Sequence, residues 1–152
     1  MEYIDLVNEA YKENIEIVEM NFNDNIKGLY CDNIIGLNKN IETATERKCI
    51  LAEELGHFYT SSGNIINNSI LCKKSENTAR RWAYKRLITL NDFIDAFNYG
   101  INTLDDLAKY LDVTLPFLKE TINFYNRKYG VRTVVDDYII FFEPCFSIMK
   151  NF

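Results

Sequence analysis

The segment of residues 43–60 constrains this chain most, because it predicts a buried helix that carries ionisable groups. Thr43 begins a capping-box sequence, the usual start of a helix. The apolar residues that follow fall on nearly every side of the helix, a pattern that is typical of a buried one. The same turns carry Glu53, Glu54 and His57. Burying these groups without a partner is costly, and a bound cation would serve two carboxylates and an imidazole.

The spacing within this helix favours a metal site. His57 is the only histidine in the chain, so any imidazole ligand or imidazole acid–base chemistry depends on it. Glu53 lies four residues earlier, and the two side chains therefore project from one helix face toward a common point. Glu54 lies one step around the helix, where a general base could contact a metal-bound water. The alternative is an ordinary solvated helix face, on which such glutamates are common.

A catalytic zinc usually takes three protein ligands, so a third is expected later in the chain. Glu76 is the best candidate: it lies in the first turn of the next predicted long helix, residues 76–87, on the same side as Ala79. Small residues there would let the helix approach another closely. Asp92 and Asp95 are the acidic alternatives, on a shorter predicted helix. Glu76 could instead be a favourable charge at a helix N-terminus, and both interpretations stay open.

The order of the predicted elements indicates an α+β chain, because strands come first and helices follow. We expect a small antiparallel sheet from residues 15–38, packed beside the helix of residues 43–60. Its strands are residues 15–20, 26–30 and 33–37. Further helices are expected over residues 3–11 (facing inward through Ile4, Val7 and Tyr11), 76–87, from a cap at Asn91 to Gly100, from a cap at Thr103, and from Thr114 to Gly130. Residues 64–69 read as a loop and 131–142 as β-rich.

Length and composition bound the remaining possibilities. With 152 residues, 47% of them hydrophobic, the chain suits a single domain, 1–152, with a catalytic core of residues 1–100 and a helical and β-rich C-terminal subregion of residues 101–152. A net charge of −5 disfavours nucleic-acid binding, and no apolar run suggests a membrane partner. The cysteines form no C-x-x-C pair, which favours reduced thiols and a cytoplasmic location; they are Cys31, Cys49, Cys72 and Cys145.

The run RKCILAEELGHFY at residues 47–59, followed by ENTARRWA at residues 76–83, resembles the ImmA/IrrE family of metallopeptidases. Members carry H-E-L-G-H on one helix and E-x-x-A-x-x-[FW]-A on the next. The resemblance covers roughly residues 3–100. It implies a zincin-like fold and assigns roles by position: Glu53, His57 and Glu76 as metal ligands and Glu54 as the general base.

The resemblance also implies a cofactor and a partner. The metal would be zinc, with manganese or another divalent cation as the alternative, because Glu53 replaces a histidine and makes the ligand set harder. The substrate would be a protein regulator, such as the helix-turn-helix repressor of a phage or mobile element. Glu53 leaves two interpretations, a working or weakened endopeptidase, which we favour, and an inactive pseudo-peptidase. Spacing does not select the oxyanion stabiliser among Tyr59, Tyr84 and Arg80.

The rival from another class is a DNA-binding regulator, because residues 103–130 read as a helix-turn-helix. Charge argues against DNA contact, since acidic and basic residues balance within this segment. A packing unit that completes the core is favoured, and it could also dock the protein substrate. A pure interaction protein that needs no metal is the third possibility.

Overall fold

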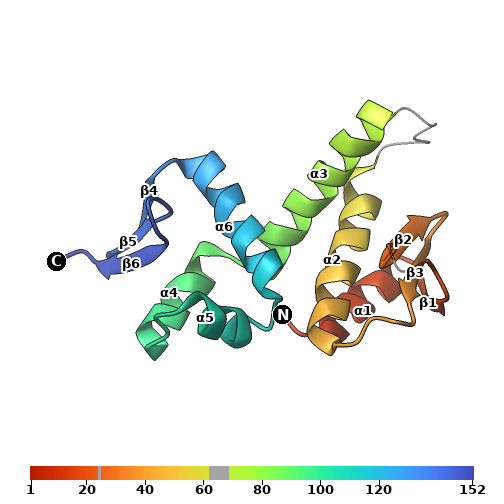
Figure 1. Ribbon diagram of the computed structural model, residues 1–152, viewed down its shortest axis with the longest axis horizontal. Coiled ribbons are helices and arrows are strands. Elements are labelled where there is room, and N and C mark those ends of the chain that lie inside the picture. The colour runs from red at the N-terminus through yellow and green to blue at the C-terminus, as the bar shows by residue number, and fades with distance from the viewer. Residues whose placement is uncertain (24, 62–68) are drawn as a thin grey trace. The chain divides into compact units, whose positions relative to one another are not determined.

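The structure is a computed structural model that describes residues 1–23, 25–61 and 69–152, the last range with backbone alone over residues 69–74 (Figure 1). The chain divides into two compact units, Met1–Leu87 and Ile88–Phe152. Of the loop predicted at residues 64–69, residues 64–68 lie outside the described part, as does the side chain of Cys72, whereas Ser69 begins a helix, contrary to the prediction. In the described residues no helix is both long and apolar enough to cross a lipid bilayer. The division into a single domain with two subregions stays a prediction.

The first unit contains a mixed three-stranded sheet and three helices. The elements are α1 (Tyr3–Lys12), β1 (Glu16–Met20), β2 (Gly28–Cys31), β3 (Ile34–Asn38), α2 (Ala44–Thr60) and α3 (Ser69–Leu87). The predicted hairpin is confirmed, and its turn residues Asp32 and Asn33 both have positive φ, 45° and 61°, as a tight hairpin turn requires. The expectation of a fully antiparallel sheet is wrong, because β1 pairs with β3 in parallel.

The strand order explains this difference. The order is β1-β3-β2, so the chain leaves β1, passes over the position next to it and forms β2 at the free edge. The following strand, β3, then fills the gap and runs in the direction of β1. This arrangement puts β2 at an edge of the sheet, where it packs against α2.

The inner face of α1 also differs from the prediction. Leu6 and Ala10 are fully buried, whereas Ile4 and Tyr11 are 57% and 82% exposed. The helix packs against α2 and β1. The small residue Ala10 lies on the packed side of the helix. The large side chains of Ile4 and Tyr11 were therefore not a sufficient guide to which face of α1 is buried.

Helices α2 and α3 pack closely side by side (Figure 1). The Thr43 hydroxyl caps α2 by accepting a hydrogen bond from the Glu46 amide at 3.1 Å. A Cβ atom added to Gly56 would lie 2.3 Å from the carbonyl oxygen of Ala79, so only glycine permits this approach of the two backbones. The predicted burial of Ala79 is confirmed. Because α3 begins at Ser69, Glu76 lies within the helix, and the interpretation as an N-terminal charge is wrong.

The second unit has three helices and an antiparallel sheet in the order β4-β5-β6. The elements are α4 (Leu90–Tyr99), α5 (Leu104–Leu111), α6 (Leu115–Tyr129), β4 (Arg132–Val135), β5 (Tyr138–Phe141) and β6 (Ser147–Lys150). The predicted caps Thr103 and Thr114 and the predicted end at Gly130 are confirmed. The cap of α4 is Thr89 rather than Asn91, because Thr89 and Asp92 form a reciprocal capping box.

Candidate functional site

A cleft of about 690 Å³ lies beside the edge strand of the first unit. One wall is β2 with its turn, residues 28–33, and the other is formed by α2 and α3. Three of the predicted site residues line it, namely Glu54, His57 and Glu76. Glu53 is absent from this lining. The fold therefore brings the predicted base and two predicted ligands to one cleft, next to a strand with a free edge.

Cross-helix ion pairs connect α2 to α3 at the cleft. The Nε2 atom of His57 lies 3.2 Å from Oε2 of Glu76. The guanidinium of Arg80 lies 3.3 Å from Oε1 of Glu76, one turn away on the same helix, and 4.0 Å from Oε2 of Glu53. Sequence reasoning did not foresee Arg80 as a partner of both carboxylates. The i,i+4 spacing of Glu76 and Arg80 was the available signal for one of these pairs.

Glu54 occupies the most enclosed position of the site, with 8% of its surface exposed. Its carboxylate lies against Gly28, where an added Cβ would be 2.8 Å from Oε1, and accepts a hydrogen bond from the Tyr30 main-chain amide. Burial raises the pKa of Glu54 to about 7, against the opposing effect of His57. A carboxyl with a pKa near neutrality can both accept and return a proton at physiological pH, which is what a general base needs.

The neighbouring groups are electrostatically coupled. The hydrogen bond that His57 donates to the Glu76 carboxylate raises the pKa of His57 above its ordinary value, against the lowering effect of burial. The same hydrogen bond lowers the pKa of Glu76. Burial raises the pKa of Glu53, and the charge of Arg80 opposes that rise. The site thus favours an ionised Glu76 beside a protonated His57 when no other cation is present.

The donor set fits a divalent cation in part. His57 and Glu76 already approach each other closely enough to share an ion, and an imidazole with carboxylates suits zinc or manganese. Glu53 would have to exchange its contact with Arg80 for the ion. As described, residues 1–23, 25–61 and 69–152 contain no group of three His, Cys, Asp or Glu side chains arranged to hold a metal.

The other residues that the sequence offered as site candidates have different surroundings. Tyr59 stacks on Trp82, with ring centroids 4.9 Å apart, and hydrogen-bonds to Glu9; Tyr84 is buried. Asp92 and Asp95 belong to α4 in the second unit, where Asp92 serves the cap of that helix.

The comparison with protein families agrees with this geometry. A protein-family model described as "IrrE N-terminal-like domain" matches residues 10–123, which is most of the chain. The family that it represents is a peptidase family. No curated protein and no solved structure matches. The family is one of metallopeptidases, so a divalent metal and a protein substrate are implied in general terms. The α+β architecture, with its sheet beside the helix that carries Glu54 and His57, is consistent with that family. The chain belongs to the IrrE N-terminal-like family of peptidases.

Proposed function

We propose that this protein is a metal-dependent endopeptidase that cleaves a protein regulator, such as a helix-turn-helix repressor of a phage or mobile element. The observation that carries the proposal is the cleft in which buried Glu54 lies beside His57 and Glu76, next to the edge strand β2. Family membership supports peptidase chemistry in general. The choice of a repressor as substrate, of zinc as metal and of the cytoplasm as location rests on the resemblance stated from sequence.

The edge strand supports the binding of an extended substrate. On its inner side β2 is bonded to β3, and its other side has no neighbouring strand in the described sheet. A peptide in extended form can add to such an edge through main-chain hydrogen bonds. Residues 28–33, which include β2, form one wall of the cleft, and Glu54 lines the same cleft. A peptide added to the edge of β2 would therefore run past Glu54.

Each site residue has a distinct task in this proposal. Glu53, His57 and Glu76 would hold the cation, which when bound supplies Lewis acidity toward the scissile carbonyl. Glu54 accepts a proton from the attacking water and later donates it to the leaving amine, a cycle suited to its raised pKa. The Tyr30 amide and the space at Gly28 keep the Glu54 carboxylate in place for both transfers.

The test combines metal content with cleavage. Protein purified without chelator should contain zinc or manganese at near one equivalent by mass spectrometry, and should cut a helix-turn-helix repressor substrate. Glu54→Gln should keep the metal and lose cleavage, whereas His57→Ala should lose both. Glu42→Gln, at an exposed position outside the cleft, is the matched control. Cleavage by Glu54→Gln at the parent rate would rule out the proposed base.

One observation favours the pseudo-peptidase alternative. Arg80 lies within ion-pair distance of both Glu53 and Glu76 and supplies the positive charge that a metal would otherwise provide. Under this alternative the parent binds no metal even after reconstitution, and Arg80→Gln exposes the carboxylates and allows zinc to bind. Metal in the parent at one equivalent, unchanged by Arg80→Gln, would exclude it.

A further inference from the structure

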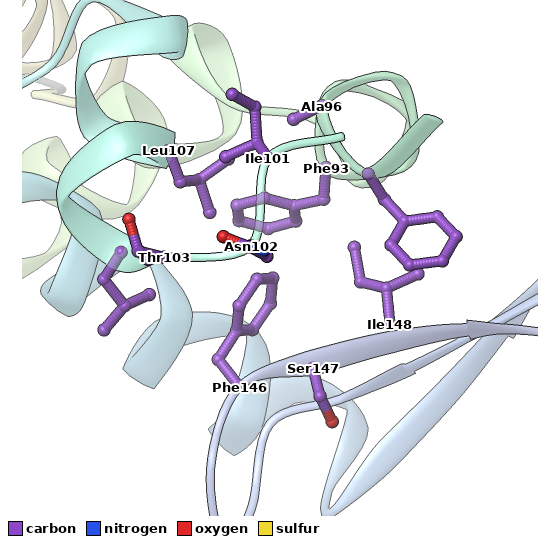
Figure 2. A pocket seen from close by; sticks show the side chains of 11 residues that line it. Phe93, Ala96, Ile101, Asn102, Thr103, Leu107, Phe146, Ser147 and Ile148 are labelled. Atoms are coloured by element: carbon purple, nitrogen blue, oxygen red, sulfur yellow. The ribbon is translucent and has the colours of Figure 1, made fainter. Parts of the chain in front are cut away.

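The cleft of the first unit has an acidic lining. Of its described lining residues, Asp32, Glu54 and Glu76 carry carboxylates, and none is a lysine or an arginine. The cavity of about 200 Å³ within the second unit is the contrast, because none of its described lining residues is ionisable (Figure 2). An acidic lining attracts a positively charged ligand, whereas an uncharged lining cannot select a ligand by its charge.

Two of the three carboxylates in the cleft already have partners. Glu54 accepts a hydrogen bond from the Tyr30 main-chain amide. Glu76 lies 3.2 Å from the imidazole of His57 and 3.3 Å from the guanidinium of Arg80. Both carboxylates also belong to the proposed catalytic machinery. Neither is therefore available to pair with a side chain of a substrate.

The third carboxylate, that of Asp32, is available. Asp32 lines the cleft and is exposed. Among the described side chains it has no hydrogen-bond or ion-pair partner. The nearest cation along the chain, Lys27, is paired with Glu46 at 3.5 Å. The negative charge of Asp32 is therefore open to a ligand in the cleft.

The hairpin of β2 and β3 holds Asp32 in a fixed place. Cys31 and Ile34 pair across the two strands, so Asp32 and Asn33 form a two-residue turn. Asp32 has a φ of 45°, a left-handed conformation that aspartate and asparagine adopt more readily than most residues with a side chain. Asparagine serves at the next position, where φ is 61°. The turn therefore accounts for the backbone at position 32 but does not require a charge there.

The strand places Asp32 at a defined distance from the proposed base. The Tyr30 amide, which bonds to Glu54, comes two residues before Asp32. A strand advances about 3.3 Å per residue, so Asp32 lies about 7 Å further along the edge of β2 than this amide. A peptide added to the edge advances by the same amount per residue. If one of its peptide bonds lies at Glu54, a side chain about two residues away lies beside Asp32.

We propose that Asp32 selects peptides with a lysine or arginine about two residues from the bond that lies at Glu54. The inference rests on the proposed function, because it takes the cleft to be the place where a peptide substrate binds. A helix-turn-helix repressor suits this preference, since DNA-binding proteins use lysines and arginines to neutralise phosphates. In this role Asp32 determines specificity: it pairs with a side chain of the substrate and takes no part in hydrolysis.

Two peptides test this preference on the intact chain. The probe is acetyl-KKVTVKK-amide, whose central residues favour an extended strand and whose lysines include the second residue on either side of the centre. In its matched control every lysine is acetylated, which removes the charge and keeps the stem. EDTA prevents metal-dependent cleavage, and chemical shifts of ¹⁵N-labelled protein give both dissociation constants. We expect the charged peptide to bind at least about two- to fivefold more tightly, with shifts at residues 28–33.

Two matched substitutions separate the effect of Asp32 from that of net charge. Asp32→Asn and Asp136→Asn each remove one negative charge from a hairpin turn, at positions with φ of 45° and 49°. Asp136 lies between β4 and β5 in the second unit. Asp32→Asn should reduce the preference for the charged peptide by about two- to fivefold, and Asp136→Asn should leave it unchanged. Asn33→Asp adds a carboxylate to the cleft lining and should increase the preference. The dispersion of the amide spectrum establishes that each variant folds.

The outcomes distinguish this inference from the proposed function. Equal binding of the two peptides, an undiminished preference in folded Asp32→Asn, or an equal loss in Asp136→Asn would overturn the inference, even if the protein cleaves a repressor. Binding that leaves residues 28–33 unshifted, or no binding of either peptide, would overturn it as well. If the preference depends on Asp32 as expected but the protein without EDTA holds no metal and cuts no substrate, the proposed hydrolysis fails and the selection of basic peptides by Asp32 stands.

Discussion

Replacing Glu54 by glutamine should stabilise the metal-free protein at alkaline pH. The carboxyl is 8% exposed, and burial raises its pKa from 4.5 to about 7. The folded state therefore holds this proton more tightly than the unfolded state does. The stabilisation of the folded parent protein by this bound proton is fully present below pH 4.5 and is lost as the pH rises through about 7.

The size of the effect follows from the same shift. At about 1.4 kcal/mol per pKa unit, the change from 4.5 to about 7 corresponds to about 3 kcal/mol of unfolding free energy. Glutamine keeps an oxygen for the Tyr30 amide and does not ionise. We therefore expect Glu54→Gln to exceed the parent by about 1–3 kcal/mol at pH 8 and to lose most of that advantage at pH 5.

Urea unfolding at pH 5, 6, 7 and 8, in the presence of EDTA, measures this difference. Trp82 is the only tryptophan and belongs to the unit that contains Glu54, so its fluorescence reports the unfolding of that unit. Glu42→Gln, at an exposed position, controls for the loss of a carboxylate. A difference between Glu54→Gln and the parent that stays constant from pH 5 to 8 would refute the assignment of a raised pKa to Glu54.

Three further substitutions test the packing that positions the site and the second unit. Gly56→Ala places a Cβ atom 2.3 Å from the Ala79 carbonyl oxygen, and thermal unfolding should show a loss of about 3 kcal/mol or more, because backbone must move. Gly28→Ala meets the Glu54 carboxylate at 2.8 Å, so a smaller loss, about 1–3 kcal/mol, should accompany an acceleration of urea-induced unfolding. Tyr125→Phe removes a hydrogen bond of 2.6 Å to a main-chain carbonyl within the second unit. The free energy of unfolding of that unit, measured in urea, should fall by about 1–2 kcal/mol. If the two units unfold separately, the unfolding curve followed by Trp82 fluorescence should not change.

The elements that sequence predicted well are those with strong local signals. Thr103, Thr114 and Gly130 mark helix ends through side-chain capping or a conformation that glycine favours, and the structure places the ends there. The hairpin of β2 and β3 followed from alternation between two short runs. These features depend on residues close together in the chain, which sequence patterns describe directly.

The features that sequence reasoning missed depend on distant partners. The parallel pairing of β1 with β3 depends on which strand takes the central position of the sheet, and no local pattern encodes it. The helix predicted over residues 76–87 begins earlier, at Ser69. The pairing of Arg80 with Glu53 joins two helices, so it appears only when their register is known. The roles of Glu53, Glu54, His57 and Glu76 stay predictions.

The contact between Gly56 and Ala79 fixes the register of α2 against α3 along the cleft. Two helices that touch at their backbones cannot slide past each other by a residue, so the partners on either side of the contact are fixed as well. His57 opposite Glu76 and Glu53 opposite Arg80 are the neighbouring steps of that alignment. A designer who transfers this polar cluster to another pair of helices must therefore also transfer Gly56 and Ala79. The absence of a side chain at position 56 sets the alignment of the helices, and that alignment decides which charged residues meet.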